Sequence, residues 1–87
     1  MSEIEIYKPN DSARIEAMQV NGYDDLRAAL AWAGNSLRQV SPKLVEVHTL
    51  EGWVELSLNS FLIKGTSGEF YPCDPDIFRA RWVRDDA

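Results

Sequence analysis

One helical pattern restricts the fold of this chain most. Most segments after it alternate apolar and polar residues, as short strands do, so this pattern is the clearest sign of a helix. Between Asp24 and Ala33 the apolar residues recur at three- and four-residue spacing, at Leu26, Ala29, Leu30 and Ala33. That spacing puts them on one face of a helix, and Asp24 and Asp25 suit its electropositive start. Gly34 suits its end. Leu37 fits the same face, so one further helical turn is an open alternative.

Two β-hairpins are predicted downstream of this helix. Lys43 to Leu50 and Trp53 to Leu58 alternate apolar and polar residues, and Glu51-Gly52 joins them through a turn that glycine permits. Phe61 to Lys64 and Glu69 to Tyr71 form the second pair, joined through Gly65 to Gly68. Pro72 either ends the last of these strands or marks it as an edge strand.

The two segments outside this pattern give weaker signals. Ala13 to Val20 fits a helix or a strand about equally well. Asp74-Pro75 is a typical helix start, so we predict one helical turn from Asp74 to Phe78. Arg79 to Val83 then returns as a final strand, which would place Arg79 and Arg81 on one face.

The chain has 87 residues and a mass of 9.9 kDa, which allows a single domain. We expect an ordered core at about residues 13–83, with polar ends at about 1–12 and 84–87. The fold class predicted is α+β, with a small antiparallel sheet of about five or six strands packed on one α-helix. A partly open barrel is the alternative topology.

Composition excludes several classes of function. A net charge of −5 disfavours direct nucleic-acid binding, since that binding depends on neutralising phosphates. One cysteine and one histidine exclude a conventional zinc site, and we expect neither a metal nor another cofactor. The sequence has no apolar run of membrane-spanning length and no signal peptide, so we expect no membrane contact and a location in the cytoplasm.

The segment from Gly65 to Phe78, GTSGEFYPCDPDIF, resembles the C-terminal signature of a family of small tailed-phage and prophage proteins. Leu62-Ile63-Lys64-Gly65 matches the strand that precedes this signature in the family. Thr49 to Gly52 is similar to the family's hairpin, and Ile15 to Val20 to its opening strand, which favours a strand for Ala13 to Val20. The resemblance implies a phage origin, hence the host cytoplasm, and brings no catalytic residues.

A ligand or partner surface is predicted around the glycine-rich hairpin, where glycines allow close backbone approach and rings offer stacking faces. Its members are Lys64, Gly65, Ser67, Gly68, Phe70, Tyr71, Arg79 and Arg81. The arginines either neutralise nearby acidic residues or bind an anion.

Catalysis is not expected. A Cys73–His48 nucleophilic pair would need a depressed thiol pKa, and Asp74 and Asp76 oppose one. Carboxylate pairs drawn from Glu46, Glu55, Asp74 and Asp76 are ordinary surface acids in a chain of this size.

The leading hypothesis is therefore a non-enzymatic phage accessory protein that binds a host protein or small ligand. It would act as a homo-oligomer that hides surface aromatics such as Trp32, Trp53 or Trp82. The alternative is a counter-defence protein that sequesters a nucleotide-type signalling molecule, with the cations on phosphate and Phe70 or Tyr71 on the base. DNA mimicry is disfavoured because the acidic residues are interspersed with basic ones.

Overall fold

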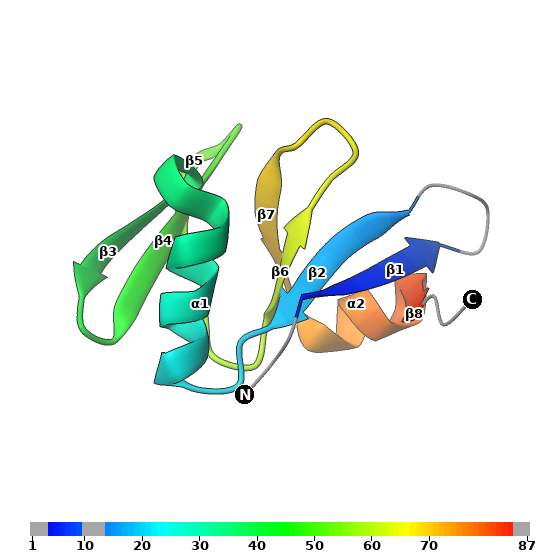
Figure 1. Cartoon of the computed structure of the whole chain (residues 1–87), viewed down its shortest axis with the longest axis horizontal. Coiled ribbons are helices and arrows are strands. Elements are labelled where there is room, and N and C mark those ends of the chain that lie inside the picture. Colours follow the sequence, from blue (N-terminus) through cyan, green and yellow to red (C-terminus); the bar gives the residue numbers. More distant parts are fainter. Residues whose placement is uncertain (1–3, 10–13, 85–87) are drawn as a thin grey trace.

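The computed structural model describes residues 4–9 and 14–84, and these confirm the α+β fold class. The described residues form two antiparallel sheets and two α-helices (Figure 1). The larger sheet has five strands in the order β7-β6-β2-β1-β8, with β1 at Glu5–Pro9, β2 at Ile15–Gln19, β6 at Phe61–Lys64, β7 at Phe70–Cys73 and β8 at Trp82–Arg84. The smaller sheet has the order β3-β4-β5, with β3 at Leu37–Ser41, β4 at Leu44–Thr49 and β5 at Gly52–Glu55.

The helix α1, Tyr23–Ala33, matches the predicted apolar face. It ends at Gly34, whose φ of 56° lies in the left-handed region that glycine adopts at low cost. A short 3-10 turn, Gly34–Ser36, then leads directly into β3. The helix therefore does not continue to Leu37, which instead begins a strand and is buried there.

The first hydrophobic core lies between α1, the inner face of the small sheet and one face of the large sheet. Leu26 and Ala29 of α1 meet Val45 and Val47 of β4, with Leu62 of the large sheet in the same cluster. All five are at most 3% exposed. This core joins the two sheets, which is why the second sheet can exist in so small a chain.

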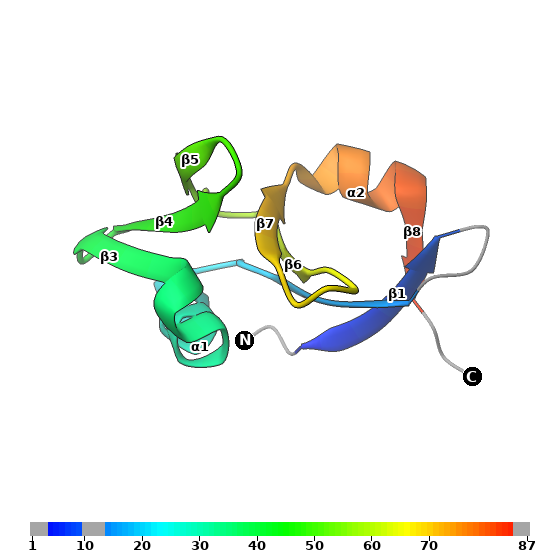
Figure 2. The ribbon, with the colours of Figure 1, turned by 90° about the horizontal axis from the view of Figure 1, so that it is seen from above.

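The second core covers the opposite face of the large sheet, where α2 packs. The helix α2, Pro75–Arg81, is capped by Asp74, whose Oδ1 accepts hydrogen bonds from the backbone N–H groups of Asp76 at 2.9 Å and Ile77 at 3.4 Å. Its one buried side chain, Phe78, stacks on Phe61 with ring centroids 3.8 Å apart. The two helices thus lie on opposite faces of the large sheet (Figure 2).

The strand predictions were partly right. Ala13 to Val20 contains β2, and both hairpins are present, as β4–β5 and β6–β7. Pro72 lies in β7, an edge strand. The strands divide between two sheets, however, whereas a single sheet was predicted.

Two strands were missed. β1 lies within the segment assigned to the polar N-terminal end, and β3 occupies a stretch left without a strand. Residues 1–3, 10–12 and 85–87 of the predicted polar ends lie outside the described residues.

The predicted final strand is present, but its predicted start at Arg79 was wrong. Arg79 and Arg81 belong to α2, and β8 begins at Trp82. Residues two apart on a helix point about 200° apart, so these two arginines do not share a face. The helix extends three residues past Phe78, to Arg81. Within the described ranges, no helix is long and apolar enough to cross a membrane.

Candidate functional site

The predicted ligand residues divide between the two faces of the large sheet. Lys64 and Phe70 are register partners, so their side chains lie on the same face as the first core. Tyr71 pairs with Ile63 and belongs to the second core, on the opposite face. Phe70 is only 8% exposed and packs edge-on against Trp32 at 5.0 Å. Phe70, one of the two rings proposed for stacking on a base, is therefore part of the core.

Three of the predicted residues do line a common hollow. Lys64, Gly65 and Gly68 border a space of about 420 Å³ next to Arg14 and Glu16. Ser67, Phe70, Tyr71, Arg79 and Arg81 do not line it. The hollow is thus lined by the glycine-rich hairpin and by one predicted cation, Lys64. The rings of Phe70 and Tyr71 do not line it.

Gly65 lies opposite Glu69 in the glycine-rich hairpin. A Cβ at Gly65 would meet only the end of the Glu69 side chain, which is flexible and can move aside, so packing does not require glycine here. The charge of Glu69 contributes to raising the pKa of Tyr71, after the larger effect of burial.

The two predicted arginines lie on the α2 side of the sheet. The Arg79 guanidinium is 5.9 Å from the ring centroid of Phe61, a member of the second core. The positive charge of Arg81 acts on Cys73 and Tyr71, whose pKa values it lowers against larger opposing effects. Lys64 and Arg79 thus belong to opposite faces, and the eight predicted residues do not form one pocket.

Cys73 and His48 are on different sheets. Cys73 packs against the second core, and burial, with the charge of Asp74 adding, raises the pKa of its thiol despite Arg81. This direction disfavours the thiolate that nucleophilic chemistry needs. His48 instead stacks on Trp53, with ring centroids 4.8 Å apart.

The tryptophans predicted to lie at an interface have different environments. Trp32 and Trp82 are half-buried, and each packs on rings of its own chain, Phe70 and Phe78 respectively. Trp53 is 36% exposed, on the outer face of the small sheet. That outer face also carries Arg38 and His48, whose side chains contact the Trp53 ring.

We call this surface the Trp53 face, made of Arg38, Glu46, His48, Trp53 and Glu55. The register places Arg38, Glu46 and Glu55 in one row across the three strands and His48 beside Trp53 in the next. The Arg38 guanidinium lies 4.2 Å from the Trp53 ring centroid, and its nitrogen is 2.7 Å from a carboxylate oxygen of Glu46.

The charges of the Trp53 face explain why Arg38 reaches across the sheet. Glu46 and Glu55 stand directly opposite each other on β4 and β5, an arrangement that like charges make unfavourable. Arg38 offsets it by binding Glu46 and covering the indole, a cation–π contact worth about 0.5–1 kcal/mol at exposed sites. Trp53 was predicted to lie at an interface, but Arg38 was not, because these residues are fifteen positions apart and meet only in the folded sheet.

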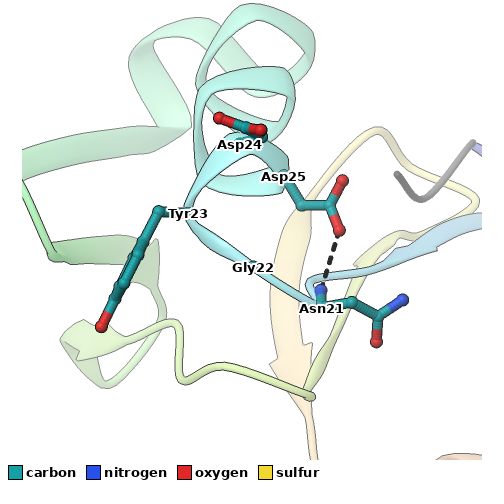
Figure 3. Close-up of a pocket in the computed structure, with 5 residues that line it drawn as sticks. All are labelled: Asn21, Gly22, Tyr23, Asp24 and Asp25. Atoms are coloured by element: carbon teal, nitrogen blue, oxygen red, sulfur yellow. Dashed lines mark hydrogen bonds between the residues drawn. The ribbon is translucent and has the colours of Figure 1, made fainter.

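A hollow of about 380 Å³ at the start of α1 has a structural explanation. It is lined by Asn21, Gly22, Tyr23, Asp24 and Asp25 (Figure 3). The carboxylate of Asp25, only 2% exposed, accepts a hydrogen bond from the Asn21 backbone N–H at 2.9 Å. This contact closes the turn that leads from β2 into the helix, as capping interactions do.

Within residues 4–9 and 14–84, no three His, Cys, Asp or Glu side chains cluster in a way that could hold a metal ion. Comparisons with protein-family models, curated proteins and solved structures find no match.

Proposed function

We propose that this chain is a non-enzymatic accessory protein of a tailed phage, that it acts by binding a host protein, and that the Trp53 face is the contact surface. The observation that carries the proposal is Trp53 itself. A large ring lies partly exposed on an uncovered sheet face, with Arg38 and His48 against it. Tryptophan and arginine are the residue types that most often dominate the binding energy of protein interfaces.

The order within the Trp53 face supports a role in binding. Arg38 is held by Glu46, and the Trp53 ring is held by Arg38 and His48. Side chains that are already ordered lose less conformational entropy when a partner arrives, so more of their contact energy contributes to affinity.

The surroundings of the two nucleophile candidates support binding over catalysis. Burial raises the pKa of the Cys73 thiol, which keeps it protonated. The one imidazole of the chain is engaged with Trp53 on the other sheet. The phage origin in the proposal depends on the resemblance of the Gly65–Phe78 segment.

The proposal is tested by affinity capture with the tagged full chain from a bacterial host lysate. A host protein retained by the wild-type chain should be retained at least about tenfold less by Trp53→Ala, and less by Arg38→Ala. Ile77→Ala is the matched control, because Ile77 is a large exposed apolar residue on α2. Circular dichroism verifies that each variant is folded. Equal capture by Trp53→Ala and wild type would contradict the assignment of this face.

The nucleotide-sequestering alternative stays a prediction. Its cations and rings are divided between two faces, so a nucleotide would have to use the hollow beside Lys64 without the stacking of Phe70. A thermal-shift series with cyclic and linear nucleotides tests it directly. A rise in Tm that Lys64→Ala abolishes would favour it over the protein-binding proposal.

A further inference from the structure

The face of the large sheet that carries the first core is covered over only part of its width. Met18 and Leu62, on β2 and β6, are buried beneath α1 and the small sheet. Ile6 on β1 and Val83 on β8 are 50% and 48% exposed, and Ile4, just before β1, is 44% exposed. In Figure 2, β1 lies at the end of the molecule away from α1.

These aliphatic side chains form one patch. Ile6 pairs in register with Glu16, which pairs with Lys64, so all three lie on the same face. Val83 is the register partner of Lys8, two residues from Ile6, which makes Ile6 and Val83 diagonal neighbours on that face. We call the patch of Ile4, Ile6 and Val83, bordered by Arg14, Glu16 and Lys64, the β1–β8 face.

We infer that the β1–β8 face binds a second copy of this chain and forms a two-fold symmetric dimer. The inference rests on the homo-oligomer hypothesis and names its surface, which differs from the tryptophans first considered. In a two-fold interface, the same patch meets itself, so it must be self-complementary. The β1–β8 face meets this condition, because its aliphatic side chains can pack against their own copies. Glu16 of one chain can also face Lys64 of the other, with Arg14 as a second cation nearby.

The composition of the patch also favours a second copy over another partner. Homodimer interfaces are more apolar than transient ones, and the exposed apolar residues of this patch are all isoleucine or valine. β1 and β8 together are about 10 Å wide, and two such sheet faces can stack at about 10 Å from each other. The patch is small, so the dimer should be weak, with a Kd on the order of 10–100 μM.

Sedimentation velocity of the full chain over a concentration series measures this association. The wild-type chain should shift from its monomer mass of 9.9 kDa towards twice that value as concentration rises. Ile6→Glu should raise the dimer Kd at least about tenfold, since it buries a charge in the aliphatic centre. Ile77→Glu is the matched control, because Ile77 is also 50% exposed but lies on α2. It should leave the Kd unchanged.

A charge-swap experiment separates contacts between chains from contacts within one. Glu16→Lys and Lys64→Glu each place like charges together on their own chain and across a homodimer. Mixing the two variants should restore association, since each face then meets the opposite charge. If Glu16 and Lys64 acted only within their own chain, mixing the two variants would not restore association.

Three results would overturn the inference. They are a wild-type chain that stays monomeric up to about 1 mM, a dimer that Ile6→Glu leaves intact, and charge variants that mixing does not rescue. The charge variants decide the matter even if Ile6→Glu fails to fold. The dimer and the host-binding proposal can fail separately, because Trp53→Ala should reduce capture of the host protein at least about tenfold and leave sedimentation unchanged.

Discussion

The attachment of α2 to the sheet depends on one side chain, Phe78, which gives a sharp prediction for Phe78→Ala. Phe78 is the only buried residue of α2 and is 1% exposed. Its ring stacks on Phe61 and meets the edge of Tyr7 at 4.7 Å. Truncating a buried phenylalanine costs about 3–5 kcal/mol. A chain of this length has a total stability of about 4–13 kcal/mol, so the variant should lose a large fraction of it.

Urea denaturation followed by circular dichroism measures this loss as the change in the free energy of unfolding. Phe78→Leu keeps an apolar side chain and removes the ring pairs, so it should cost less, about 1–3 kcal/mol. Ile77→Ala, at the exposed neighbouring position, should cost less than about 1 kcal/mol. A folded Phe78→Ala variant that loses less than about 1 kcal/mol would refute the view that this ring holds α2 in place.

Three further predictions concern single polar groups. Asp25→Ala should cost about 1–3 kcal/mol, since it leaves the Asn21 N–H without its carboxylate partner at a part-buried site, whereas Asp24→Ala should cost less than about 0.5 kcal/mol. The hydrogen bond that Asp25→Ala removes is part-buried, since the Asp25 side chain is buried and Asn21 is exposed. Chemical denaturation compares the two variants. Asp74→Ala should cost about 0.5–2 kcal/mol through loss of the α2 cap, with faster hydrogen exchange in that helix. The Cys73 pKa is raised, so its alkylation rate should titrate at higher pH than that of an unfolded control. The folded state holds the thiol proton more tightly than the unfolded state does. The contribution of the protonated Cys73 thiol to the free energy of unfolding should therefore be lost as pH rises from the unfolded-state pKa through the folded-state pKa.

Local signals predicted the elements that have strong caps and turns. The apolar face of α1 and the stop at Gly34 need only neighbouring residues, as does the Asp74-Pro75 start of α2. The length of α2 could not be predicted in this way. It depends on the docking of Phe78 against Phe61, seventeen residues earlier, and no residue after Phe78 resembles a helix stop.

The two missed strands have little local signal of their own. β3 buries only Leu37, and that residue also fits the helical pattern of α1. β1 did carry a signal, since Ile4 and Ile6 alternate with acidic residues, but both isoleucines are exposed in the single chain. Alternation without burial is weak evidence for a strand, because the intrachain core does not enforce its register. The division into two sheets follows from which strands pair over long range, and local pattern does not determine that.

The same distinction applies to the candidate sites. Glycines and aromatics close together in sequence suggested a ligand pocket, yet adjacent residues of a strand point to opposite faces, as Phe70 and Tyr71 do. The Trp53 face is assembled instead from residues on three strands, brought together by register. In a chain that is mostly β-sheet, residues that share a surface are therefore found by cross-strand pairing more often than by proximity in sequence.

Cross-strand pairing also shows how the charges behind the net charge of −5 are distributed on the surface. Both proposed contact surfaces place a cation beside carboxylates, Arg38 with Glu46 on one and Lys64 beside Glu16 on the other. A surface of mixed charge discriminates partners by the positions of its charges, whereas a uniformly acidic surface repels a second copy and attracts any basic protein. The overall acidity argues against nucleic acid as a partner, and the local mixture is what makes specific protein contacts, including self-association, physically reasonable for this chain.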